Sequence, residues 1–453
     1  MKAGTEPVTA FPWPDTLTVP VRTLPEHTRI RVAFSGGLDS VLLLHLAVFC
    51  HRARVPVDAI HVNHQLQHNA GETEAFCLSQ CEALGIPLLL RRVTVSTGRE
   101  AGSTSGIEEA ARKARYQVFE EVLEPGDLLL MAHHADDQAE TVLFRLLRGS
   151  GVAGLAGMPR CRPLGRGELV RPLLDLERSE LALWAGRAAL SWVEDPSNSD
   201  RRYDRNFLRH TIIPELKARW PGLTSRIRHS AESCGDSEYL NSVLAQKQWE
   251  ECSTREGNLS VVALELLSLP EQKNLLYWWI RERGFQPPSG AAVAQALQDL
   301  LKAGDDRTPC LSGPGYSLRR FRGQVWLVGD ALGTVPDQPV ALVPGNPVKW
   351  GRWRLSLEAA GANPKPDFPE IRISTRLGGE RLRPHPDGPS KPLKKWFQEQ
   401  AVPPWERPSV PLVFAGSGDA RELIAVGDFW CSAQYTGAAA AAGWRLIVRR
   451  DFD

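Results

Sequence analysis

The stretch Ser35–Ser40, SGGLDS, has residue types that suit the binding of phosphate groups. Gly36 and Gly37 allow a sharp backbone turn and bring main-chain amides close to an anion without side chains in the way. Ser35 and Ser40 add hydroxyl donors, and Ser40 is expected to begin a helix whose free amides and dipole favour negative charge. The stretch lacks the lysine of the Gly-x-x-x-x-Gly-Lys-Ser/Thr loop, which grips a terminal phosphate. A different way of handling a nucleotide is therefore expected.

Asp39 defines that difference, because a carboxylate repels phosphates unless a divalent cation lies between them. A magnesium ion that bridges Asp39 and a leaving pyrophosphate would remove the repulsion. The loop therefore suits ATP that is cleaved between its α and β phosphates and leaves an adenylated intermediate. We predict an ATP site formed by Ser35, Gly36, Gly37, Leu38, Asp39 and Ser40, with Mg²⁺ held through Asp39.

A second group of polar residues lies in HHADDQAET, residues 133–141. Asp137 and Glu140 are three positions apart and share one face of a helix, where the pair could hold an ammonium group or a metal ion. The alternative for Asp136 and Asp137 is that they cap the helix and oppose its dipole. A zinc site is disfavoured because no third soft ligand is nearby. His133 and His134 lie at the end of a predicted strand, where we expect a general base or a phosphate contact.

Arg112 is the third candidate, on a helix expected over residues 106–123. Its planar fork suits phosphate oxygens. The alternative is a solvated ion-pair face, because Glu108 and Arg112 are spaced as an i,i+4 pair.

The elements that position these residues alternate between strand and helix over the first 150 residues. Apolar runs predict strands at 29–35, 57–64, 87–95 and 126–134, and helical patterns follow at 40–52, 72–85, 106–123 and 135–149. Repeated β-α-β units predict a twisted, mostly parallel sheet with helices on both faces. SGGLDS, HVNH and HHADD lie at the ends of predicted strands, and ligands of such sheets bind at the carboxyl ends of the strands.

Composition limits the class of protein. The 453 residues exceed one ordinary domain, and 42% hydrophobic with 24% charged residues is typical of a globular protein. The net charge of +1 means that a nucleic acid would have to be met by local basic patches. Eight cysteines without a Cys-x-x-Cys pair disfavour zinc ribbons, iron–sulfur sites and disulfide frameworks. We expect a cytoplasmic protein without a membrane partner, since neither a signal peptide nor a long apolar run is present.

The remaining chain predicts further domains. We expect an N-terminal extension (1–27), a catalytic α/β domain (28–220), a mainly helical domain (225–332) and a small C-terminal α+β domain with strands (345–453), and we expect the last two to bind a nucleic acid. Basic residues outnumber acidic ones over 201–230 and 371–408, and aromatic residues are interspersed. Such patches suit phosphate contacts and stacking on unpaired bases, although a charged face is often only solvated. The candidates for these contacts are Arg201, Arg202, Arg205, Arg209, Lys391, Lys394 and Lys395.

SGGLDS resembles the PP-loop of N-type ATP pyrophosphatases. Together with VNHQL, EEAARKARY, HHADDQAET, RGSGVAGLAGM, RPLLDLERSEL and the basic run 192–216, it is similar in order and spacing to the tRNA(Ile)-lysidine synthetase family. The resemblance covers about residues 28–220 and resumes over 375–413. One departure is Gly106, where the family often has a polar residue.

The resemblance implies a two-step ligation. ATP adenylates the carbonyl oxygen of the wobble cytidine in an isoleucine tRNA with a CAU anticodon, and pyrophosphate leaves. The amine of free L-lysine then attacks that carbon, AMP leaves, and lysidine is formed. In this scheme Asp137 and Glu140 would bind the lysine amine, while His133 and Arg112 would meet phosphate and transition-state charge. The helical domain, the C-terminal domain and the basic candidates named above would bind the tRNA. A homodimer is compatible with the sequence.

Two other functions remain as alternatives. A PP-loop enzyme that thiolates tRNA would need a reactive cysteine or a Cys-x-x-Cys cluster near the site, and the eight cysteines show neither arrangement. A catalytically inactive tRNA-binding scaffold is disfavoured by the intact loop and by Asp137 and Glu140.

Overall fold

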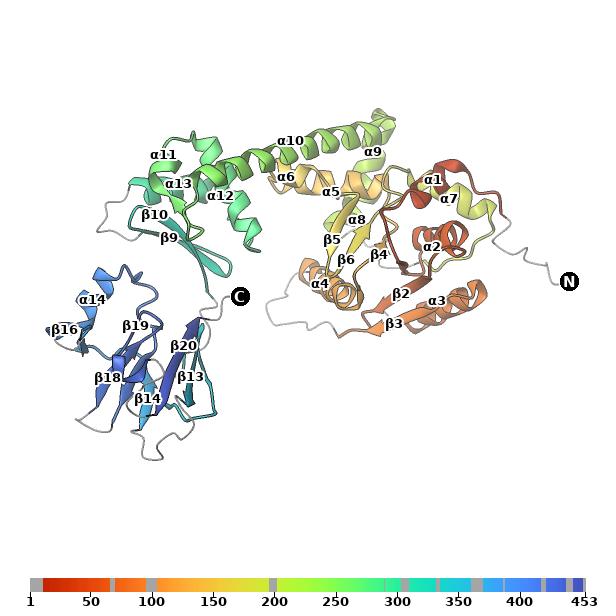
Figure 1. Cartoon of the computed structure of the whole chain (residues 1–453). Helices are drawn as coiled ribbons and strands as arrows, with labels where there is room; N and C mark the ends of the chain where they lie inside the picture. The colour runs from red at the N-terminus through yellow and green to blue at the C-terminus, as the bar shows by residue number, and fades with distance from the viewer. Residues whose placement is uncertain are drawn as a thin grey trace. The chain divides into compact units, whose positions relative to one another are not determined.

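Figure 1 shows a computed structural model of the chain. The structure describes residues 11–65, 70–94, 104–194, 202–288, 290–302, 309–330, 335–359, 370–385, 388–416, 421–436 and 443–450. The chain divides into two compact units, Met1–Asn241 and Ser242–Asp453, and each is described by itself. In the described part of the chain, no helix combines the length and the apolar character needed to cross a membrane.

The first unit is built on a six-stranded sheet with the order β3-β2-β1-β4-β6-β5. Five strands run parallel, and β5 pairs antiparallel with β6. The strands are β1 (Arg29–Ala33), β2 (Val57–Asn63), β3 (Leu88–Arg92), β4 (Asp127–Leu130), β5 (Cys161–Leu164) and β6 (Gly167–Val170). The chain passes from β1 to β2 and β3 on one side and continues with β4 on the other. The strand order thus switches beside β1, where sheets of this type bind ligands.

Helices cover both faces of this sheet. The helices that precede α10 (Leu223–Cys252) in this unit are α1 (Asp15–Arg22), α2 (Leu38–His51), α3 (Ala70–Leu84), α4 (Thr104–Val122), α5 (Ala135–Leu147), α6 (Val152–Leu155), α7 (Arg178–Arg187), α8 (Asp204–Phe207) and α9 (Ile213–Arg219), with a π-helical turn η3 (Leu208–Ile212) between α8 and α9. Residues of α1, α2, α3 and α7 share one apolar core with the sheet, and residues of α4 form a second. The expected fold class is confirmed.

The helix α2 explains why the loop before it is held firmly. Leu42, Leu43 and Leu44 are all fully buried, because α1 and α7 cover the sides of α2 that do not face the sheet. The segment expected as an N-terminal extension differs from that expectation. From Trp13 onward it belongs to this core, and α1 is one of the two helices that cover α2.

The second unit begins within the long helix α10 (Leu223–Cys252) and first forms a helical layer with a small antiparallel sheet. The helices are α11 (Val261–Glu265), α12 (Leu269–Glu282) and α13 (Gly290–Lys302). The sheet has the order β7-β10-β9-β8, with β7 (Leu259–Ser260), β8 (Cys310–Gly313), β9 (Tyr316–Phe321) and β10 (Gln324–Gly329). Trp279 lies in the core between these layers.

The C-terminal part consists of small antiparallel sheets and one short helix. The first sheet has the order β11-β14-β17-β18-β19, the second β12-β13-β20, and β15 pairs with β16. The elements are β11 (Val340–Ala341), β12 (Val348–Trp350), β13 (Trp353–Ala359), β14 (Ile371–Ser374), β15 (Arg381–Leu382), β16 (Lys391–Pro392), α14 (Leu393–Glu399), β17 (Leu412–Ala415), β18 (Glu422–Val426), β19 (Trp430–Cys431), η5 (Ala433–Tyr435) and β20 (Trp444–Arg450). The first sheet therefore includes residues before position 345, where the sequence placed the start of this domain.

Candidate active site

The loop between β1 and α2 turns at Gly36, whose φ angle is +83°. This left-handed conformation is one that residues with a side chain rarely adopt. A Cβ atom at this position would lie 3.2 Å from Cys77 Sγ and 3.3 Å from Thr73 Cγ2, both on α3. Glycine is therefore needed here both for the backbone angle and for the close packing of the loop on α3.

Hydrogen bonds from two serines fix the shape of the loop. The hydroxyl oxygens of Ser35 and Ser40 are 3.0 Å apart, and Ser40 Oγ donates to the Gly37 carbonyl at 2.9 Å. The helix α2 begins at Leu38 with Gly37 as its N-cap, two residues earlier than the sequence predicted. The first amides of a helix have no carbonyl partner within the helix. The loop and the start of α2 thus present main-chain donors suited to an anion.

Asp39 lies at the start of α2, and its carboxylate has few partners that balance its negative charge. Its Oδ1 is buried and has no hydrogen-bond partner among the described residues, and its Oδ2 is 3.8 Å from His134 Nε2. Burial raises the pKa of Asp39 above its usual value, and the charge of Asp137 adds to this effect. A buried carboxylate oxygen without a partner fits a cation ligand. No group of three or more His, Cys, Asp or Glu residues in the described chain is arranged to hold a metal, so phosphates and water would supply the other ligands of Mg²⁺.

His134 connects the loop to the second polar group. It caps α5: its Nδ1 accepts a hydrogen bond from the Asp137 amide at 3.3 Å, and its own amide donates to Asp137 Oδ2 at 3.1 Å. Because Nδ1 is an acceptor, the neutral ring carries its proton on Nε2, the atom nearest to Asp39. His134 is only 2% exposed, so the orientation of its ring is fixed by packing.

Asp137 and Glu140 lie on one face of α5, and both bind Arg209 from η3. Arg209 Nε donates to Glu140 Oε1 at 2.5 Å, and its Nη2 donates to Asp137 Oδ1 at 2.8 Å and to Glu140 Oε2 at 2.9 Å. Burial raises the pKa of Glu140, whereas the two carboxylates raise the pKa of Arg209 against the effect of its own burial. The structure therefore places Arg209, a candidate for tRNA binding, inside the pair proposed for lysine.

The neighbouring Asp136 has separate partners. It accepts hydrogen bonds from Lys217 Nζ at 2.5 Å and from the Arg178 amide at 2.9 Å. These contacts hold α9 and the start of α7 against α5. Asp136 thus joins helices, while Asp137 and Glu140 hold the guanidinium of Arg209.

His133 points toward a different set of residues. Its Nδ1 accepts a hydrogen bond from Arg171 Nε at 3.2 Å. Burial lowers the pKa of His133 to about 3, and the charges of Arg171 and Arg112 contribute. At neutral pH the ring is therefore uncharged, with its proton on Nε2. Arg112 lies near this histidine, since its charge helps to lower the pKa of His133, and its Nη2 donates to the Tyr116 hydroxyl at 3.3 Å.

Arg171 and Tyr116 were missed in the sequence. Arg171 directly follows β6, so it stands at the carboxyl end of a parallel strand, as the predicted site residues do. The short strands β5 and β6 were not predicted, and this signal was therefore not used.

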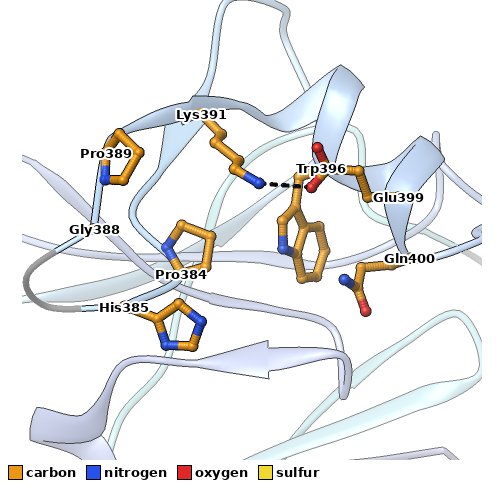
Figure 2. Close-up of a pocket in the computed structure, with 8 residues that line it drawn as sticks. All are labelled: Pro384, His385, Gly388, Pro389, Lys391, Trp396, Glu399 and Gln400. Carbon is orange, nitrogen blue, oxygen red and sulfur yellow. Dashed lines mark hydrogen bonds and ion pairs between the residues drawn. The ribbon is translucent and has the colours of Figure 1, made fainter.

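The other candidates for tRNA binding are spread over both units. Arg201 lies outside the described residues, and Arg202 is exposed. The guanidinium of Arg205 lies 5.6 Å from the centre of the Phe144 ring on α5. In the second unit Lys394 and Lys395 are exposed on α14. Figure 2 shows Lys391 beside Trp396 in a pocket, with its Nζ 2.9 Å from Glu399 Oε2.

Comparison with known proteins identifies the family of this chain. Residues 15–216 match the model of a PP-loop domain, residues 259–326 that of a TilS substrate binding domain, and residues 371–448 that of a TilS substrate C-terminal domain. The tRNA(Ile)-lysidine synthase of Alkalilimnicola ehrlichii is 40% identical over 444 residues, which cover 96% of each chain. The chain belongs to the tRNA(Ile)-lysidine synthase family.

Other relatives of the synthase family agree with this assignment. The tRNA(Ile)-lysidine synthase of Coxiella burnetii is 35% identical over 445 residues, 96% of each chain, and that of Salmonella heidelberg is 38% identical over 403 residues, 86% of this chain and 90% of the relative. Among solved structures, the U34-tRNA thiolase NcsA from Methanococcus maripaludis matches with a TM-score of 0.40 and 20% identity, over 48% of this chain and 77% of that chain. The prediction of an ATP-dependent ligase with a PP-loop domain is confirmed.

Proposed function

We propose that the family's reaction takes place at the carboxyl ends of β1 and β4, on the wobble cytidine of an isoleucine tRNA with a CAU anticodon. In the first step the cytidine carbonyl oxygen attacks the α-phosphorus of ATP, and pyrophosphate leaves. In the second step the amine of L-lysine attacks the activated carbon, the bond to oxygen breaks, and AMP leaves. The protein is expected to act in the cytoplasm, where its tRNA substrate is found.

The loop around Gly36 would hold the nucleotide phosphates. The amides of the loop and of the first turn of α2 are donors, and the Ser35–Ser40 contact keeps them in place. Asp39 would hold Mg²⁺, which when bound neutralises charge on the leaving pyrophosphate. Because Asp39 Oδ1 is buried without a partner, this carboxylate depends on a cation for compensation.

Asp137 and Glu140 would bind the ammonium group of lysine. The observation that carries this proposal is the guanidinium of Arg209 between the two carboxylates, because it demonstrates that the pair accommodates a cation. Lysine would have to displace Arg209 or share the carboxylates with it. His134 lies between this pair and Asp39, so the two binding functions are adjacent.

His133 would serve as a neutral hydrogen-bond donor. Its Nδ1 is engaged by Arg171, and burial lowers its pKa to about 3, so it is a weak base at neutral pH. The N–H on Nε2 remains available to stabilise developing negative charge on a phosphate or carbonyl oxygen. This role differs from that of a general base.

Cys77 bears on the alternative of thiolation. It lies beneath the loop, close to Gly36, but burial raises the pKa of its thiol to about 12. A thiolation step needs a thiolate, which this cysteine does not supply at neutral pH.

The proposal for lysine is tested by Asp137→Asn, with Asp136→Asn as the matched control. Both substitutions remove one negative charge from the first turn of α5, but only Asp137 contacts Arg209. We expect Asp137→Asn to raise the KM for lysine at least tenfold and to leave the KM for ATP within about twofold. An unchanged KM for lysine, or equal effects in both variants, would show that the pair does not bind lysine.

A further inference from the structure

A cluster of arginines lies one strand away from the loop that would bind ATP. The loop follows β1, whereas this cluster gathers at the carboxyl end of β6, and β4 lies between these two strands in the sheet. Its centre is Arg171, which is 2% exposed and donates to His133 Nδ1 at 3.2 Å and to the Pro159 carbonyl at 2.7 Å. A buried guanidinium is thus fixed in orientation beside a neutral histidine.

Tyr116 on α4 joins two more arginines to this centre. The guanidinium carbons of Arg112 and Arg162 lie 4.8 and 5.2 Å from the centre of its ring, and Arg112 Nη2 donates to its hydroxyl. Burial alone would raise the pKa of Tyr116, but the arginines around it, Arg112 foremost, bring the pKa below its usual value. Several guanidinium groups therefore lie around the half-buried Tyr116.

Among the described side chains, no carboxylate balances these charges by an ion pair. In the part of the chain whose side chains are described, no ion pair joins Arg112, Arg162 or Arg171 to a carboxylate. Burial and the neighbouring cations lower the pKa of Arg171. Like charges repel strongly where water is scarce, so the repulsion between these arginines destabilises the folded chain. A bound anion would offset this repulsion.

We propose that Arg112, Arg162, Arg171 and Tyr116 form a binding site for an RNA phosphodiester, separate from the ATP phosphate site. The assignment rests on the proposed tRNA-modifying function and adds a contact for the backbone next to the reacting nucleotide. Arginine suits phosphate because its planar fork pairs with two oxygens. His133 faces the same space and supplies an uncharged N–H.

A polyanion fits better than a second triphosphate because the positive region continues beyond the cluster. Burial lowers the pKa of Arg145 on α5, and the charges of Arg205 and Arg112 lower it further. Arg145 itself is held by the carbonyls of Gly154 and Gly157. The cationic side chains thus extend from β6 toward α5 and α8, as expected for contacts along a nucleic-acid strand.

The test is the binding of a fluorescent anticodon stem-loop RNA to the full chain, without ATP or lysine, over a range of KCl concentrations. We compare Arg162→Gln and Arg162→Lys with Arg166→Gln. Arg166 is in the same β-hairpin but is exposed and pairs with Glu124 at 2.7 Å. Arg162→Gln and Arg166→Gln remove the same charge, so a general field effect would act on both.

We expect Arg162→Gln to reduce the slope of log K against log[salt] by about 0.7 to 0.9, the contribution of one phosphate contact. At 0.1 M salt this corresponds to about five- to eightfold weaker binding. Arg162→Lys should retain most of the affinity, and Arg166→Gln should leave the slope unchanged. Weak binding by Arg162→Lys as well would indicate a folding defect of the hairpin and would count against the proposal.

Two other outcomes would overturn the assignment. RNA binding by Arg162→Gln that equals that of the unaltered chain would remove the phosphodiester site. A loss of Mg-ATP affinity in the same variant, with RNA affinity unchanged, would assign the cluster to the nucleotide. Lysine attachment to tRNA is a separate measurement, so these failures are distinct from a failure of the proposed reaction.

Discussion

Arg209 provides the most specific prediction about the acidic pair. If its guanidinium fills the site of the lysine ammonium group, the substitution Arg209→Met should strengthen the binding of free lysine to the enzyme. Methionine keeps an unbranched apolar stem of similar length and removes the charge. The side chains of Asp137 and Glu140 are then left with two negative charges and no cation.

The magnitude follows from the burial of Glu140 and Arg209. The side chain of Glu140 is 6% exposed and that of Arg209 is 34% exposed, so the interaction lies between a buried and a surface ion pair. Breaking a buried pair costs 3–5 kcal/mol and a surface pair contributes at most about 1 kcal/mol, which gives about 2 kcal/mol here. In a unit of this size that lowers the melting temperature by about 4–8 °C. The same energy limits the gain in lysine affinity to about thirtyfold.

The assay is isothermal titration of lysine into the full chain, with thermal unfolding at several lysine concentrations as a second readout. Lys217→Met is the matched control, because Lys217 pairs with Asp136 on the same helix and does not contact the acidic pair. We expect lysine to stabilise Arg209→Met more than the unaltered chain, and Lys217→Met no more than the unaltered chain. Equal or weaker lysine binding by Arg209→Met would refute the view that Arg209 competes with lysine.

Two further predictions concern the stability of the first unit. Gly36→Ala should lower the melting temperature and weaken ATP binding, because a left-handed residue with a side chain costs about 1–2 kcal/mol and the new Cβ meets Cys77 and Thr73. Gly235 lies in the middle of α10 with open space around it, so Gly235→Ala should instead stabilise the chain by about 0.5–1 kcal/mol. Thermal unfolding should therefore show a lower melting temperature for Gly36→Ala and a higher one for Gly235→Ala. Burial lowers the pKa of His45 to about 4, so between pH 6.5 and 4 the unfolded chain binds a proton that the folded chain excludes, and stability should fall as the pH falls through this window. In urea unfolding, the free energy of unfolding should differ less between pH 7 and pH 5 for His45→Leu than for the unaltered chain. Equal differences would contradict this assignment.

The alternation of strands and helices in the first unit could be predicted, because parallel strands that are buried on both faces have continuous runs of apolar residues. Residues 127–130, DLLL, are all buried, and the runs of β1 and β2 are similar. Once these strands were located, the polar residues that follow them identified the loop and the start of α5. The tRNA-binding roles remain predictions.

Other features had no local signal. The helix α1 contains Pro20 and polar positions, and only its packing on α2 makes it part of the core. The pairing of Arg209 with Glu140 joins residues 69 positions apart, and that of Arg171 with His133 joins residues 38 positions apart. No periodicity connects such pairs, so the cation in the acidic pair and the arginine cluster became visible only in the folded chain.

We propose that Asp39 serves the adenylation step, whereas Asp137 and Glu140 serve the attachment of lysine. The most direct test measures pyrophosphate release and attachment of radiolabelled lysine in parallel, on an unmodified CAU-anticodon isoleucine tRNA transcript, with Asp39→Ala and Asp137→Asn. We expect Asp39→Ala to lose both signals, and Asp137→Asn to release pyrophosphate while its lysine attachment is reduced and recovers at high lysine concentration. Loss of both signals in Asp137→Asn, or attachment of lysine by Asp39→Ala, would contradict the division of roles.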